Sequence, residues 1–291
     1  MTAVFRKVGQ IALCFVYSAI AILVFAGIQI GAGFMMAYAG LNLEINDGAF
    51  TVVYSVIVIT VGYIIIKVGG LAGEDGLVHT RKLGNESLCS VFIAFGMLGL
   101  VTLFIVLIGY LADANVGNTQ EELERYSESV DRFANVEIQF VPPIDNVFCL
   151  IGSAFLVPLA EELTFRGFVM GFFRTAVNPV WAMILSSALF AVLHSTPIQM
   201  IYACLCGVML GMIYHLTGSL WGSYIVHMVF NLFGGAIATF FQSGIIPVPD
   251  GFIDNFSYVT ALAEILMIGP AVGALMFLIN MHKKKAVNEQ A

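Results

Sequence analysis

Two adjacent carboxylates lie in the middle of an apolar run. Glu161 and Glu162 are followed by Arg166, all inside the otherwise hydrophobic stretch 147–173. A helix of that length can cross a bilayer. Ionisable groups at such a depth cost several kcal/mol each, and they are found mainly where they are paired or functional. The sequence therefore predicts a polar site around these residues.

Helical geometry separates the two carboxylates. Glu162 and Arg166 are four residues apart and share a helix face, so an ion pair between them would lower the cost of both charges. Glu161 is turned by about 100° from Glu162 and can face the interior of a bundle. We expect the first pair to be structural and Glu161 to be available for chemistry.

Three further polar side chains fall inside later apolar stretches, namely His194, His227 and Asn231. His227 and Asn231 are again four residues apart and share a face. At a rise of about 1.5 Å per residue from the expected helix ends, all three lie at a depth similar to that of Glu161. The sequence predicts one shared site with a carboxylate, two imidazoles and a carboxamide.

Such a group could activate water. A carboxylate in a low-dielectric site can act as a general base near neutral pH, and a histidine can share the water or protonate a leaving amine. Histidine and asparagine donors can stabilise an oxyanion. Alternatively, Glu161, His194 and His227 could hold a divalent metal such as zinc, although the His-Glu-x-x-His signature is missing. The metal-bound and the metal-free mechanism are both left open.

The elements that must position these residues are membrane helices. Of the 291 residues, 59% are hydrophobic and 11% are charged, and the mean hydropathy is +0.94, whereas soluble domains carry about 25% charged residues. We expect an all-α, polytopic membrane protein with about eight transmembrane helices in one bundle, forming a single integral membrane domain over residues 1–291. The expected spans are 11–39, 50–71, 88–111, 147–173, 179–196, 198–216, 219–241 and 259–281.

The basic residues near the ends of these spans indicate how the protein is oriented in the membrane. The first apolar stretch is about twice as long as the core of a signal peptide, so we expect a transmembrane helix there. With the N-terminus inside, only Arg125 and Arg132 fall on the outer side. The inner basic residues are Arg6, Lys7, Lys67, Arg81, Lys82, Arg174, Lys283, Lys284 and Lys285. We therefore expect a multi-pass protein with both termini cytoplasmic, in the plasma membrane of a bacterium. The side to which the site opens is left undecided.

The acidic residues do not predict a nucleic-acid partner. The net charge is −7, but much of it is concentrated in the segment 112–146. Apolar residues recur there at three- and four-residue spacing, which is typical of a short amphipathic helix. We expect an acidic extramembrane loop with such a helix on the outer surface, and an ordinary cytoplasmic connector over residues 71–87.

The ordered polar motifs resemble the CPBP family of CAAX prenyl proteases and bacteriocin-processing enzymes (Abi proteins), which includes the type II CAAX prenyl endopeptidases. The family pattern is Glu-Glu-x-x-x-Arg, then Phe-x-x-x-His, then His-x-x-x-Asn. Here the three motifs are Glu161 to Arg166, Phe190 to His194, and His227 to Asn231. The similarity covers residues 147–235, which would be the catalytic core. The first three helices and the last one match only in being apolar.

The resemblance implies an intramembrane endopeptidase, often labelled a metalloprotease. By this resemblance Glu161 activates the water with help from His194, and His227 and Asn231 stabilise the oxyanion. Glu162 and Arg166 are structural or orient the substrate. The implied partner is a membrane-embedded or membrane-anchored peptide in the lipid bilayer, either of CAAX type or a bacteriocin or other exported peptide. Two alternatives stay open, a proton-coupled transporter and a non-catalytic bacteriocin-immunity scaffold.

Overall fold

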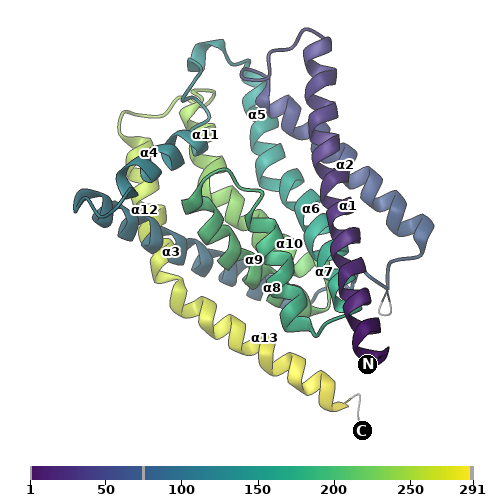
Figure 1. Cartoon of the computed structure of the whole chain (residues 1–291). Helices are drawn as coiled ribbons and strands as arrows, with labels where there is room; N and C mark the ends of the chain where they lie inside the picture. Colours follow the sequence, from purple (N-terminus) through teal and green to yellow (C-terminus); the bar gives the residue numbers. More distant parts are fainter. Residues whose placement is uncertain (1, 74–75, 289–291) are drawn as a thin grey trace.

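The protein is described by a computed structural model that covers residues 2–73 and 76–288, so Glu74 and Asp75 of the predicted 71–87 connector lie outside it. The described chain is helical, and the first turn of α1 and the last turn of α13 lie at the same end of the bundle (Figure 1). The all-α prediction is confirmed. The helices are α1 (Thr2–Tyr38), α2 (Asp47–Gly69), α3 (Glu86–Asp113), α4 (Thr119–Val130), η1 (Ile138–Phe140), α5 (Pro143–Ile151), η2 (Gly152–Leu156), α6 (Val157–Glu162), η3 (Leu163–Val169), α7 (Met170–Arg174), α8 (Pro179–Ala191), α9 (Pro197–Thr217), α10 (Leu220–Asn231), η4 (Leu232–Ala236), α11 (Ile237–Gln242), α12 (Phe252–Leu266) and α13 (Ile268–Asn288).

The number of spans is lower than the eight expected. Within residues 2–73 and 76–288, 6 helices are long and apolar enough to cross a membrane, or up to 7 if the pair α12 and α13, bent by 44°, forms one span. The predicted span 179–196 is wrong in length, because α8 has only 13 residues. Such a helix rises about 20 Å, short of a hydrocarbon core of about 30 Å. The predicted span 259–281 falls on the bent pair.

Local chemistry explains both ends of α8. Pro179 occupies the first turn, and the Asn178 side chain accepts a hydrogen bond from the Trp181 amide at 3.0 Å. The helix ends at Ala191, and the next helix begins at Pro197. A proline disfavours helical backbone in the residue before it, so α8 cannot continue into α9 without a break. Thr196 is extended there and caps α9 by accepting from the Gln199 amide at 3.3 Å. His194 consequently lies in the turn between α8 and α9.

The span Pro143–Arg174 is one apolar helix of 32 residues with π-helical turns on both sides of α6. Each wide turn alters the register of the residues that follow, and π turns inside α-helices are frequent at functional sites. The segment after α6 is deeply buried, since Phe165, Val169, Met170 and Phe173 are at most 1% exposed. The two glutamates at the end of α6 thus lie next to a fully buried segment of the core.

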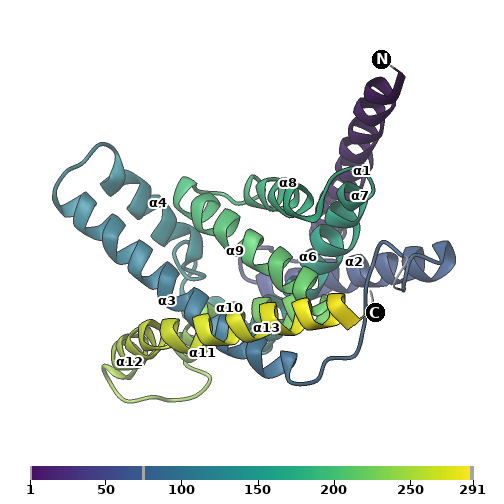
Figure 2. The ribbon, with the colours of Figure 1, turned by 90° about the horizontal axis from the view of Figure 1, so that it is seen from below.

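The segment 112–146 is held against the rest of the bundle by helix packing and by ion pairs. Its helix α4 confirms the predicted amphipathic helix, and α4 packs against α3 and α9, as seen from below in Figure 2. Arg132 is only 6% exposed and pairs with Asp47 at 2.9 Å and with Asp145 at 2.5 Å. Asp145 also accepts hydrogen bonds from the Gly48 and Ala49 amides at the start of α2. Arg132 therefore ties this segment to α2 and α5.

Candidate active site

The predicted ion pair is present and fully buried. Nη1 of Arg166 lies 2.7 Å from Oε1 of Glu162, and the two side chains are 1% and 0% exposed. Arg166 also donates to the carbonyl of Gly207 at 3.2 Å. Its guanidinium lies over the ring of Phe190, 4.7 Å from the centroid. The Arg166 guanidinium is therefore contacted by Gly207 of α9 and by Phe190 of α8, as well as by Glu162 one turn earlier in the chain.

A glycine lets the backbone reach the guanidinium. A Cβ at Gly207 would lie 2.9 Å from Cβ of Ser187, so a side chain there would push α9 away from α8. Close approach of helices at small residues is a common packing mode in membranes. The carbonyl of Gly207 is therefore held where Arg166 can donate to it.

His227 stands between the two carboxylates. Its Nδ1 lies 3.0 Å from Oε1 of Glu162, and its Nε2 lies 3.5 Å from Oε2 of Glu161. Glu162 is 0% exposed, whereas the Glu161 side chain is 20% exposed. The contact also joins α10 to α6, so the imidazole is positioned by the structural carboxylate and presented to the accessible one.

The hydrogen bonds of this cluster fix the orientation of the imidazole. Oε1 of Glu162 accepts from Nη1 of Arg166 and also faces Nδ1 of His227. A carboxylate oxygen only accepts, so Nδ1 is the donor. Nε2 is then the ring nitrogen that faces Oε2 of Glu161.

His194 approaches from the turn after α8. Its Nδ1 lies 3.1 Å from the carbonyl of Phe190, and because a carbonyl oxygen only accepts, Nδ1 must be the donor. In the neutral ring Nε2 is then an acceptor. The ring packs edge-on against Phe190, with centroids 4.8 Å apart. Sequence reasoning placed His194 on a helix, whereas a turn orients it.

Asn231 is the last residue of α10. Its Nδ2 donates one hydrogen bond to the carbonyl of Ser153 at 3.0 Å, in the π-helical segment η2. An amide nitrogen carries two hydrogens, so one is left for another acceptor. The backbone of η2 therefore orients the carboxamide.

All four predicted catalytic side chains line one cavity. Glu161, His194, His227 and Asn231 surround a space of about 500 Å³. This agrees with the common depth expected from the sequence. Glu162 and Arg166 do not line it, which matches a supporting position.

The cavity has walls that sequence reasoning missed. Phe25 and Gln29 of α1, Ser129 of α4 and Tyr202 of α9 also line it. Gln29 could have been predicted as a lining residue, because it is a carboxamide within a long apolar stretch. Ser129 carried none, because a serine in a polar surface helix is ordinary. The N-terminal helix and the acidic segment are thus parts of the site.

The candidate metal ligands do not form a closed set. Among residues 2–73 and 76–288, no three His, Cys, Asp or Glu side chains are grouped as a metal site. Oε2 of Glu161 lies 3.5 Å from Nε2 of His227, whereas the His194 ring makes its hydrogen bond and its ring contact with Phe190. The donor set therefore does not fit a three-ligand metal site in this conformation, and no step below is derived through a metal.

Comparison with known proteins finds a family similarity for part of the chain. No curated protein and no solved structure matches it. One family model does match, and it covers less than half of the chain but includes all six predicted site residues. Over residues 143–233 the chain is similar to the family described as "Type II CAAX prenyl endopeptidase Rce1-like", which confirms the predicted resemblance for this segment.

Proposed function

We propose that this protein is an intramembrane endopeptidase that hydrolyses a peptide bond of a membrane-associated peptide with a water activated by Glu161 and His194. The observation that carries the proposal is the asymmetry of the two carboxylates. Glu162 is committed to Arg166 and His227, while Glu161 faces a cavity of about 500 Å³ next to the same imidazole. The family match supports the reaction class.

The first step is attack by water. Water bound between Oε of Glu161 and Nε2 of His194 gives one proton to Glu161 as its oxygen adds to the carbonyl carbon. His194 accepts the other hydrogen as a hydrogen bond and orients the nucleophile. A positioned base of this kind contributes roughly 10²–10⁴-fold to a rate.

Charge then develops on the carbonyl oxygen. The free hydrogen on Nδ2 of Asn231 and, when protonated, Nε2 of His227 are the donors nearest to this position on α10. Donors of this type stabilise an oxyanion without having to reorganise. The proton held by Glu161 passes to the leaving nitrogen as the C–N bond breaks, which yields a carboxylic acid and an amine.

The substrate class follows from the surroundings of the cavity. Most of the helices that line the cavity are apolar enough to span a bilayer, so we expect its substrate to be a peptide embedded in or anchored to the membrane. Both a CAAX-type substrate and a bacteriocin or other exported peptide fit this description. Ser129 of α4 lines the cavity, and in the proposed orientation α4 lies outside, which favours an exported peptide.

Cleavage of a membrane-peptide library by the purified protein tests the proposal. The parent, Glu161→Gln and His194→Ala are incubated with the library, and products are identified by mass spectrometry. We expect cleavage by the parent and a loss of roughly 10²-fold or more in both variants. Cleavage that persists undiminished in Glu161→Gln would overturn the assignment.

The same preparation separates the alternatives. A proton-coupled transporter would cleave nothing but would carry a pH-dependent flux in liposomes that Glu161→Gln abolishes. A non-catalytic scaffold would bind a peptide without cleaving it and without flux.

A further inference from the structure

A smaller cavity lies next to the candidate active site. It has a volume of about 310 Å³, and its walls come from α3, α4, α9, α10, η4, α11 and α12. Tyr202 and Phe230 line both this cavity and the one that Glu161 lines. Phe230 directly precedes Asn231 in α10. The two spaces therefore share a wall, and we expect a peptide bound at Glu161 to reach the smaller one with a side chain.

Glu264 of α12 lines this smaller cavity and is only 6% exposed. The helix packs closely on α3, because a Cβ at Gly99 would collide with the carbonyl oxygen of Glu264. Oγ1 of Thr102, also on α3, donates to Oε2 of the carboxyl at 3.0 Å. Among the described residues, Oε1 has no hydrogen-bond partner. The carboxyl is therefore held by one oxygen, and its other oxygen is free for a ligand.

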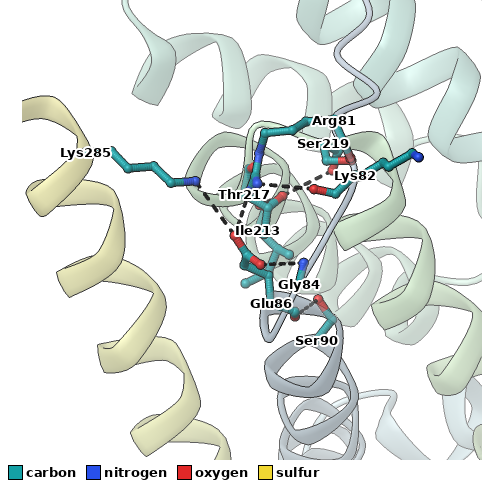
Figure 3. Close-up of polar contacts among 9 residues, drawn as sticks. All are labelled: Arg81, Lys82, Gly84, Glu86, Ser90, Ile213, Thr217, Ser219 and Lys285. Carbon is teal, nitrogen blue, oxygen red and sulfur yellow. Dashed lines mark hydrogen bonds and ion pairs between the residues drawn. The ribbon is translucent and has the colours of Figure 1, made fainter. Parts of the chain in front are cut away.

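Glu264 differs from the other buried carboxyl groups in having no basic partner. Four acidic side chains are buried in the part of the chain that the structure describes. Three of them are paired, Glu86 with Arg81 (Figure 3), Asp145 with Arg132 and Glu162 with Arg166. None of the described residues that line the smaller cavity is basic. Because ionisable groups at membrane depth are usually paired or functional, we infer that the partner of Glu264 is a ligand.

The surroundings of the cavity favour a positively charged ligand. Tyr126 brings α4 to the cavity wall, and α4 contains four glutamates and one arginine. The field of such a helix raises the local concentration of cations.

The walls distinguish between kinds of cation. Aromatic faces attract ammonium and guanidinium groups, and apolar surfaces pack against the hydrocarbon stem of a long basic side chain. Five aromatic residues line the cavity, namely Tyr126, Tyr202, Phe230, Phe233 and Phe256. A hard metal ion would need several oxygen ligands, and over residues 2–73 and 76–288 no metal-binding group of acidic, His or Cys side chains is found. The cavity therefore fits a basic side chain better than a metal ion.

We propose that this cavity binds a basic side chain of the peptide substrate, with Glu264 as the counter-charge and the aromatic rings around the stem. The inference rests on the proposed peptidase function, because the side chain arrives as part of the peptide bound at Glu161. An unpaired carboxylate is costly in a low dielectric, so Glu264 keeps a proton in the empty cavity and releases it to water when the cation binds. Glu264 thus determines specificity, and substrates carry lysine or arginine a few residues from the scissile bond.

Paired peptides test this preference. Apolar single-span peptides carry one arginine at successive positions, and each has a twin with citrulline, which has nearly the same shape but no charge. Binding is measured by fluorescence anisotropy in a neutral detergent with Glu161→Gln, so that no peptide is consumed. Cleavage of the same peptides is measured with the parent. Both measurements are repeated after adding Glu264→Gln to each protein.

The expected result is a position at which the arginine peptide binds about tenfold more tightly than its citrulline twin, the size of one charged hydrogen bond. Cleavage should show the same preference. Glu264→Gln should remove it and leave binding of the citrulline peptide unchanged. Ala261→Leu enlarges a residue of the cavity wall and should also remove the preference, which gives a second reading if circular dichroism shows that Glu264→Gln is unfolded. The matched control is Glu44→Gln, an exposed glutamate outside the cavity lining, which should keep the preference.

Binding and cleavage together separate this inference from the proposed function. If arginine is preferred in binding but no peptide is cleaved, the site stands and the peptidase assignment fails. If both twins are cleaved and bound equally at every position, the peptidase assignment stands and the site is overturned. A preference that survives in Glu264→Gln, or that Glu44→Gln also loses, overturns the site as well, because another group or the net charge of the protein would then be responsible.

Discussion

Nδ1 of His227 lies 3.0 Å from Oε1 of Glu162, the same oxygen that takes Nη1 of Arg166 at 2.7 Å. One carboxylate oxygen therefore holds a guanidinium and an imidazole from two different helices. The other carboxylate, on Glu161, contacts the Nε2 nitrogen of that imidazole at 3.5 Å. The two adjacent glutamates therefore have different partners, and we propose that they also have different roles.

The first prediction follows from this division. Glu162→Gln should lower the free energy of unfolding by about 3–5 kcal/mol, because it leaves Arg166 buried without its counter-charge. Glu161→Gln should change stability far less, because Glu161 has no guanidinium partner and borders the cavity. Thermal unfolding of both single variants in the same detergent measures the difference. Equal midpoints for the two variants would contradict the division.

The second prediction concerns His194. His194→Gln should reduce peptide cleavage by roughly 10²-fold or more, since in the proposed mechanism its Nε2 orients the water and that nitrogen is lost. Its cost in stability should stay near 1 kcal/mol, the value of the hydrogen bond to the carbonyl of Phe190. The matched control is Val192→Ala in the same turn, an exposed residue that does not line the cavity. Similar losses of cleavage in both variants would show that the turn matters and the imidazole does not.

Much of this site could be predicted from the sequence, because helical geometry is regular. The spacing of Glu162 and Arg166 predicted their pairing, and the common depth of His194 and His227 predicted one cavity. These inferences need only a rise per residue and a repeat of 3.6. They held even where the helix boundaries were wrong, since an error of a few residues shifts a depth by only a few ångströms.

Other features depend on contacts between distant segments, which periodicity does not encode. The sequence predicted that His227 would serve the oxyanion, but its bond to Glu162 depends on how α10 crosses α6. The π turns around α6 left no recognisable pattern. Arg132 was counted as an outer charge, yet it is buried between Asp47 and Asp145, two acidic residues far apart in the chain.

The third prediction concerns metal removal. We expect peptide cleavage to survive a strong chelator, because Glu161 and His227 are close to each other while no third ligand is grouped with them in the described part of the chain. The measurement is the cleavage rate before and after dialysis against the chelator, with metal content determined on the same sample. Loss of cleavage that added zinc restores would replace the proposed mechanism with a metal-dependent one.

The fourth prediction tests whether α4 forms a wall of the substrate site. Ser129 lines the cavity and is exposed on its helix, so a large side chain there has room to turn inward. Ser129→Trp should occupy part of the 500 Å³ and raise KM for a peptide substrate, with a smaller effect on kcat. The catalytic side chains are on other helices, and the chemistry of bound substrate should survive.

The matched control for Ser129→Trp is Ser127→Trp, two residues earlier on the same exposed helix and outside the cavity lining. It adds the same bulk and the same apolar surface. Its KM should equal that of the parent, and both variants should unfold at the temperature of the parent. If Ser127→Trp raises KM as much as Ser129→Trp does, the effect comes from disturbing α4 as a whole. If neither variant changes KM, the substrate does not pass along α4 and must reach Glu161 from another side of the bundle.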